Sequence, residues 1–127
     1  MQRLVFVSHS SADREAAERI AAYLEDNSVE CWIAPRDIPP GADWVEAIID
    51  GIDAASGMVL LVSESSNRSP QVRRELERAV SRGLELVSVI VEQVELSKWM
   101  QYYTSTHQRC DATVGGLQRH LPRILDF

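Results

Sequence analysis

Side chains suited to binding or catalysis stand at the ends of three apolar runs of this sequence. The first run ends in two serines around a histidine. The second run leads into a proline-rich stretch that carries an arginine and an aspartate and is followed by a tryptophan. The third run is followed by a helical segment that carries a glutamate. Such groups could bind a phosphorylated ligand, stack on a base and stabilise a positive charge. The residues are Ser8, His9, Ser10, Arg36, Asp37, Trp44 and Glu75.

Glu75 has the position expected of a carboxylate at the boundary of a core. Steps of 100° along its helix place Glu75 at the edge of an apolar stripe, whereas Glu77 points further out. The stripe consists of Val72, Leu76, Ala79 and Val80. Partial burial would raise the pKa of this carboxyl, as in many active sites. The alternative is a solvated glutamate that pairs with Arg74 or Arg78.

Ser8, His9 and Ser10 come just before a helix is expected. Their hydroxyls and backbone amides could bind a diphosphate at the N-terminus of that helix. Alternatively, Ser10 or Ser11 only caps the helix. The His9 ring could contact a substrate, but a packed or solvent-facing imidazole fits the sequence equally well.

Arg36, Asp37 and Trp44 belong to the proline-rich stretch and the helix after it. The two charged residues could contact a ligand or a neighbouring subunit, or could form an internal ion pair that fixes the loop. The Trp44 ring could stack on a base or ribose. It could equally belong to the core, because it falls in line with Ile48 and Ile52.

Five apolar runs alternate with helical segments and predict the elements that position these residues. Strands are expected at residues 3–8, 29–33, 57–63, 84–91 and 108–112, and helices after Asp13, from Trp44, from Pro70, and over residues 96–103 and 114–125. Three prolines and a glycine make residues 34–42 a stiff loop, and residues 64–69 also form a loop.

This alternation implies a single α/β domain over residues 1–127, with a parallel sheet and helices on both faces. The runs 4–7 and 58–62 are apolar throughout, which favours central strands and the sheet order 2-1-3-4-5. Ligands of such sheets bind at the carboxyl ends of the strands. The loops at residues 8–11, 34–41 and 64–70 lie there, so the functional site is expected among them.

Composition argues against several classes of function. The net charge of −6 disfavours nucleic acid as a partner, and no apolar run is long enough for a membrane span or a signal peptide, so a cytoplasmic protein is expected. Neither a P-loop nor a GxGxxG phosphate loop occurs. No metal-ligand spacing or Ser/His/Asp set is present, and Cys31 and Cys110 are expected to be reduced, buried thiols.

Four segments of the chain resemble bacterial TIR (Toll/interleukin-1 receptor) domains. They are VFVSHSSAD, CWIAPRDIPPGADW, LLVSESSNRSPQVRREL and WMQYYTSTHQRCDA. The resemblance implies a flavodoxin-like fold with a five-stranded parallel sheet. It also implies self-association with other TIR domains through the proline-rich loop, specifically through Pro35, Ile38, Pro39, Pro40 and Gly41.

Glu75 stands where NAD-cleaving TIR domains have their catalytic glutamate. The resemblance therefore implies cleavage of the nicotinamide–ribose bond, with NAD+ as a substrate and no cofactor, in a bacterial immune or signalling system. The product would be ADP-ribose or a cyclic form. Many active members have an aromatic residue one turn earlier, where this chain has Gln71, so the ribose wall is different or comes from a second subunit. The alternatives are a non-catalytic interaction module and a mimic of host TIR domains.

Overall fold

The computed structural model describes residues 3–126, in which strands and helices alternate. The strands are β1 (Leu4–Ser8), β2 (Glu30–Trp32), β3 (Gly57–Val62), β4 (Glu85–Ile90) and β5 (Gln108–Asp111). The helices are the 3-10 turn η1 (Ser11–Asp13), α1 (Arg14–Asp26), α2 (Trp44–Ala54), α3 (Glu64–Asn67), α4 (Pro70–Ser81), α5 (Lys98–Thr104) and α6 (Leu117–Asp126). None of these helices is long and apolar enough to cross a membrane.

The sheet is parallel throughout and has the predicted order, β2-β1-β3-β4-β5. Strand β1 lies between β2 and β3, where Val5 is in register with Cys31 on one side and Gly57 on the other. All six residues of β3 are buried. The continuous apolar runs thus form the centre of the sheet, because a strand covered on both faces needs no polar side.

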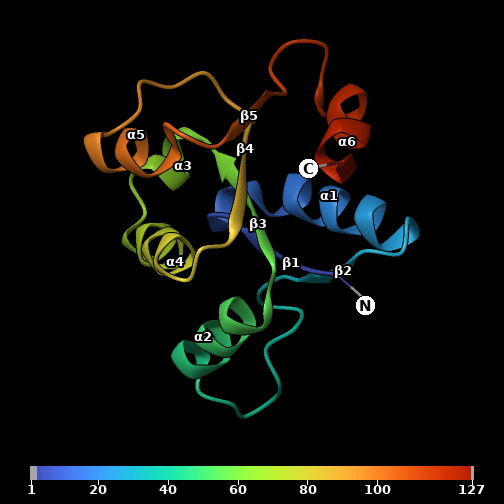
Figure 1. The fold of residues 1–127 in the computed structure, drawn as a ribbon, viewed down its shortest axis with the longest axis vertical. Coiled ribbons are helices and arrows are strands. Elements are labelled where there is room, and N and C mark those ends of the chain that lie inside the picture. Colours follow the sequence, from blue (N-terminus) through green and yellow to red (C-terminus); the bar gives the residue numbers. More distant parts are fainter. Residues whose placement is uncertain (1–2, 127) are drawn as a thin grey trace.

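Helices cover both faces of the sheet (Figure 1), with α1 and α6 on one side and α2, α4 and α5 on the other. Successive residues of a strand point to opposite faces. Val59 and Leu61 therefore pack against α1 and α6, and Met58 and Leu60 pack against α2 and α4. On the second face, the stacked rings of Phe6 and Trp32 have centroids 4.9 Å apart.

Helix α4 begins as predicted, with the Ser69 hydroxyl accepting a hydrogen bond from the Val72 amide and Pro70 in the first turn. It buries Val72, Leu76 and Ala79, but Val80 is exposed, so the apolar stripe is one residue shorter than expected. The inner face of α4 also carries Glu75, which contacts Ser8 at the carboxyl end of β1.

Two predicted boundaries were wrong for local reasons. Residues 64–69 were expected to be a loop but contain the short helix α3, which a reciprocal capping box between Ser63 and Ser66 stabilises. Four polar residues show no helical period, so the pattern of hydrophobicity could not predict this turn. Helix α6 starts at Leu117 rather than at residue 114, because Gly115 and Gly116 both have positive φ.

Candidate active site

Glu75 lies on the inner face of α4 and is buried, with 7% of its surface exposed. The Ser8 hydroxyl at the end of β1 donates to its Oε1 at 2.8 Å, and the Gln71 amide donates to its Oε2 at 3.0 Å. Burial raises the pKa of this carboxyl, while the bonds from Gln71 and Ser8 and the charge of His9 lower it. The solvated alternative is therefore wrong, since neither Arg74 nor Arg78 pairs with Glu75; Arg78 binds Asp53 instead.

A cavity of about 670 Å³ opens next to Glu75, at the carboxyl end of β1. Ligand pockets commonly have volumes of roughly 300–1,000 Å³. Apolar surface from Phe6, Ile48 and Trp44 forms part of its wall, and Glu75 is the acidic residue among those that line it. A buried carboxylate beside an apolar wall suits a reaction that develops positive charge on a sugar.

Ser8 supports Glu75 from behind and does not face the cavity. Its surface is fully buried and its hydroxyl points at the carboxylate. Direct substrate contact, as predicted from the sequence, would require an exposed hydroxyl. In the structure, the Ser8 hydroxyl instead holds the Glu75 carboxylate in place through its hydrogen bond.

His9 lines the cavity and connects β1 to the proline-rich loop. Its Nδ1 lies 2.8 Å from the Ser10 carbonyl oxygen, and its Nε2 lies 3.2 Å from the Ala34 carbonyl oxygen. Both partners accept hydrogen bonds, so a neutral ring donates to one of them and a doubly protonated ring donates to both. The half-buried ring thus forms part of the wall between β1 and the loop.

Ser10 also lines the cavity, but its hydroxyl does not cap a helix. It donates to the Asp13 carboxylate at 2.9 Å, and Ser63 at the end of β3 donates to the same carboxylate. Asp13 therefore ties the carboxyl ends of β1 and β3 together. The expected capping by a serine side chain was wrong, because no backbone amide of η1 or α1 donates to a capping side chain.

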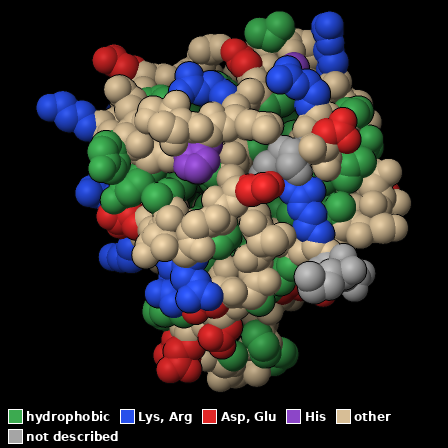
Figure 2. All heavy atoms as spheres, in the orientation of Figure 1, with side chains coloured by type: hydrophobic (Ala, Val, Ile, Leu, Met, Phe, Trp, Pro, Cys, Tyr) green, Lys and Arg blue, Asp and Glu red, His purple; other side chains and the backbone are tan. Residues whose placement is uncertain are grey.

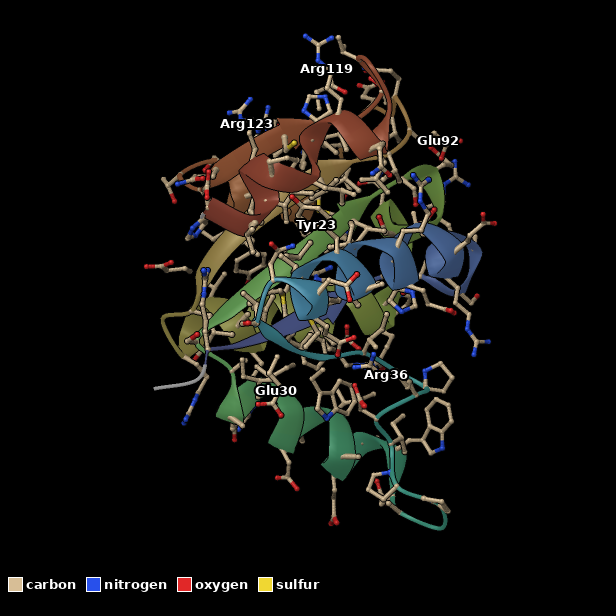
Figure 3. The ribbon with its side chains drawn as sticks, turned by 90° about the vertical axis from the view of Figure 1, so that its right-hand side faces the viewer. Tyr23, Glu30, Arg36, Glu92, Arg119 and Arg123 are labelled. Carbon is tan, nitrogen blue, oxygen red and sulfur yellow. The ribbon has the colours of Figure 1, made fainter. Side chains whose placement is uncertain are left out.

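Arg36 and Asp37 fix the loop and lie away from the wall that contains Glu75. Arg36 makes a bidentate pair with Glu25 at 2.9 and 2.8 Å and also donates to Asp37. Asp37 in turn accepts a hydrogen bond from the Ile33 amide at 2.8 Å. Figure 3 shows Arg36 between α1 and this loop. The internal ion pair, one of the two sequence-based alternatives, is what the structure contains.

The proline-rich loop exposes most of the residues predicted for self-association. Pro35, Pro39, Pro40 and Gly41 are exposed, and Gly41 has a φ of +78°. Ile38 is buried and anchors the loop in the domain. Four of the five predicted residues are thus available to a neighbouring molecule.

Trp44 is 58% exposed, so the expected core position was wrong. It is the first residue of α2, whereas the buried residues Ile48 and Ile52 come one and two turns later. Its ring instead lies at the cavity wall beside Val45, which is 64% exposed. This leaves a large aromatic surface at the mouth of the cavity.

The described part of the chain offers neither a metal site nor a reactive thiol. Residues 3–126 hold no cluster of three or more histidine, cysteine or acidic side chains suited to a metal ion. Cys31 and Cys110 are free and buried, as predicted, and burial raises the pKa of Cys31 to about 12. A thiol with such a pKa is a poor nucleophile at neutral pH. Glu75 therefore remains the best-placed reactive group.

Comparison with protein families identifies the chain. The family model for the TIR domain matches residues 5–121, which is nearly the whole sequence. The chain belongs to the TIR domain family. The parallel sheet with the order β2-β1-β3-β4-β5 and its two helix layers are thus the fold of a TIR domain.

Solved structures share the fold of this TIR domain at low sequence identity. The TIR domain of the Toll-related receptor TRR-2 from Hydra magnipapillata superposes with a TM-score of 0.77 and 19% identity, covering 96% of this chain and 94% of that one. A TIR-STING receptor from C. gigas gives 0.72 and 23%, covering 96% of this chain but 38% of the receptor. The CMP N-glycosidase BcmB of Clostridium botulinum gives 0.69 and 13%, covering 98% and 100%.

Some residues of the TIR domain site were not predicted as ligand contacts. Arg14, Val45 and Gln71 also line the cavity. Gln71 is four residues before Glu75, and helical spacing alone could have placed their side chains together. Arg14 is the first residue of α1 and forms a surface pair with Glu18, for which the sequence offers no distinguishing signal.

Proposed function

We propose that this TIR domain cleaves the bond between nicotinamide and ribose in NAD+. The observation that supports the proposal is the buried Glu75 carboxylate, held by two donors at the wall of a cavity of about 670 Å³. As the bond breaks, its electron pair moves to the nicotinamide ring nitrogen, and positive charge develops on the ribose. The carboxylate would stabilise that charge electrostatically.

The reaction ends when a nucleophile adds to the anomeric carbon. With water, NAD+ and H2O yield nicotinamide, ADP-ribose and one proton. With a ring nitrogen of the adenine of the same molecule, the product is a cyclic ADP-ribose. Nicotinamide leaves as a neutral molecule and needs no general acid, which fits a cavity with one acidic residue.

Two further observations support this chemistry. BcmB, which has the same fold, is a CMP N-glycosidase, so the fold carries the cleavage of a base–ribose bond in another protein. Trp44 also presents an aromatic face at the mouth of the cavity, suited to stacking on a base or ribose. We propose a cytoplasmic location, which the two free thiols support, and a role in a bacterial signalling or immune system.

The deciding experiment is incubation of concentrated protein with NAD+ and detection of nicotinamide together with ADP-ribose or its cyclic form. Nicotinamide is expected from the native protein and not from Glu75→Gln at equal concentration. NAD+ that stays intact at high protein concentration would contradict the proposal.

A second function, protein interaction, rests on the exposed loop. Pro39, Pro40 and Gly41 lie near the exposed Trp44 and Val45, and together they form a partly apolar surface at one end of α2. We propose that other TIR domains dock there and that assembly completes the open side of the cavity. Sedimentation velocity over a range of concentrations tests this, and a monomer at all concentrations would contradict it.

A further inference from the structure

Both oxygens of the buried Glu75 carboxylate accept a hydrogen bond from a side chain. Ser8 reaches Oε1 from β1, and Gln71 reaches Oε2 from the preceding turn of α4. The two donors differ in their surroundings, because Ser8 is fully buried whereas Gln71 is exposed and lines the cavity. Gln71 thus lies on the side of the carboxylate that a substrate would approach.

The direction of the Gln71 amide follows from its two neighbours. The Arg74 guanidinium donates to its Oε1 at 3.5 Å, and its Nε2 faces Glu75. The opposite orientation would set a carbonyl oxygen against a carboxylate and an amide NH2 against a guanidinium. The neighbouring charges therefore hold the NH2 group toward Glu75.

Few charged groups face Glu75 from the elements around it. His9 comes from the end of β1 and exerts an attractive charge on the carboxylate. Arg14, on α1, lines the same cavity, and Arg74, on α4 itself, acts through Gln71. No other acidic side chain is among the described residues lining this cavity. The hydrogen bonds from Ser8 and Gln71 are thus the direct contacts that favour the ionised form.

We propose that Gln71 is a positioning residue, whose amide keeps the Glu75 carboxylate ionised and fixed in orientation at the cavity wall. The inference rests on the proposed NAD+ cleavage. Each carboxylate oxygen retains a free lone pair with which it can accept a hydrogen bond from a ribose hydroxyl. The Gln71 amide therefore orients the Glu75 carboxylate and leaves acceptor sites on it for the substrate.

The test replaces the donor while keeping the size of the side chain. Gln71→Leu removes the amide, and Gln71→Glu replaces it with a second carboxylate, which disfavours ionisation of Glu75 further. Gln101→Leu is the matched control, because Gln101 is an exposed glutamine on α5 that donates to the Leu96 carbonyl oxygen, away from the cavity. Arg74→Gln removes the guanidinium that donates to the Gln71 Oε1, and it should raise the pKa of Glu75 by less than either Gln71 variant does.

We expect the acid limb of the pH profile of kcat/KM to move to higher pH in Gln71→Leu, and further in Gln71→Glu. Removing a donor to a carboxylate raises the pKa of that carboxyl, so the ionised form is lost at a higher pH. At low pH, kcat/KM of Gln71→Leu should be roughly tenfold below that of the native protein, as for a lost hydrogen bond to a charged group. Gln101→Leu should keep the native profile.

A second readout needs no activity. The carbon NMR signal of the Glu75 carboxyl, followed as a function of pH, reports its ionisation directly. A higher midpoint in Gln71→Leu supports the inference, and an unchanged midpoint overturns it, even if the variant is less active. If the native protein leaves NAD+ intact, the proposed function fails, while the NMR comparison still decides the role of Gln71.

Discussion

At the level of single residues, a carboxylate that is costly to bury lies at the wall of the cavity. Glu75 is 7% exposed and is held by a hydroxyl and an amide instead of by a cation. A salt bridge would stabilise the same carboxylate more firmly and would neutralise the charge that a cationic ribose needs. The arrangement therefore leaves the carboxylate with the negative charge that the proposed reaction needs.

Glu75→Gln should lower the rate of NAD+ cleavage by two orders of magnitude or more. It keeps the volume and removes a charge worth a few kcal/mol at the transition state, at roughly tenfold per 1.4 kcal/mol. Nicotinamide release at saturating NAD+ measures the effect.

The matched control is Glu77→Gln on the same helix. The Glu77 side chain is 41% exposed and interacts with Arg73 and Tyr103, outside the cavity. The rate of NAD+ cleavage by Glu77→Gln should differ from that of the native protein by less than about threefold, as for a surface charge. A variant of Glu77 that loses activity while Glu75→Gln keeps it would show that the catalytic carboxylate has been misplaced.

The same burial predicts an effect of Glu75 on the pH dependence of stability. Because burial raises the pKa of this carboxyl in the folded state, the native protein binds its proton more tightly than the unfolded chain does. The stabilising contribution is complete below the pKa of the unfolded glutamate and is lost as pH rises through the folded pKa.

Glu75→Gln should therefore melt above the native protein at neutral pH. The difference in melting temperature should shrink as pH falls through the raised pKa of the folded state toward about 4, the unperturbed pKa of glutamate, and should stay constant below it. Calorimetry at several pH values measures this. A constant difference in melting temperature across the range would show that the cost of burying the charge is not what separates the two proteins.

At the level of elements, the close approach of α2 to the sheet depends on a missing side chain. A Cβ atom at Gly51 would lie 2.8 Å from two ring atoms of Trp32, and that ring is stacked on Phe6. The contact is with the body of the ring and not with a flexible end. The α2 backbone can thus rest directly on Trp32 only where no side chain intervenes.

Gly51→Ala should destabilise the fold by roughly 1–3 kcal/mol, as for an overpacked core. Helix propensity alone predicts the opposite sign, because alanine favours a helix over glycine by about 1 kcal/mol. Asp50→Ala, at the exposed neighbouring position, should change stability little. Urea denaturation of the three proteins decides, and an increase in stability of Gly51→Ala would refute the packing argument.

Most elements could be predicted from the sequence because their signals are local. The apolar runs of β1 and β3 indicate central strands, and Ser69 and Pro70 mark the start of α4. The Ser8–Glu75 contact joins residues 67 positions apart, and no spacing in the sequence encodes it. The bond between Arg36 and Glu25 was missed for the same reason. The burial of Trp44 was ambiguous because the first residue of a helix can fall on the same face as its core residues and still lie beyond the edge of the core.

At the level of the whole molecule, charge and apolar surface are unevenly distributed. Figure 2 shows acidic side chains gathered at the end of the molecule where α2 lies, while both signs are interspersed elsewhere on that face. The exposed residues of the proline-rich loop and the start of α2 lie at the same end (Figure 1). A neighbouring molecule that docks there would approach both the loop and the mouth of the cavity.

The rate of NAD+ cleavage per molecule should rise with protein concentration and fall when Gly41→Val weakens assembly. Valine at a φ of +78° is strained by about 1–2 kcal/mol, so the exposed loop should change shape while the core stays intact. Activity and sedimentation are measured together over a hundredfold dilution.

Gly83→Val controls for this strain. Gly83 has a φ of +73°, and an added Cβ there, as at Gly41, meets no atom within 4 Å. It follows α4, away from the proline-rich loop, so its variant should be destabilised similarly and assemble normally. Equal loss of assembly in both variants, or a rate per molecule that does not change with dilution, would argue against a role for the loop.

The position of β1 inside the sheet also has a consequence for biosynthesis. The ribosome produces β1 and β2 first, but the other edge of β1 stays without a partner until β3 emerges, more than forty residues after the end of β1. During that interval the nascent chain exposes an apolar strand edge that can pair with another chain. The Ser8 hydroxyl likewise can bind Glu75 only once α4 has been synthesised, after β3 at the centre of the sheet.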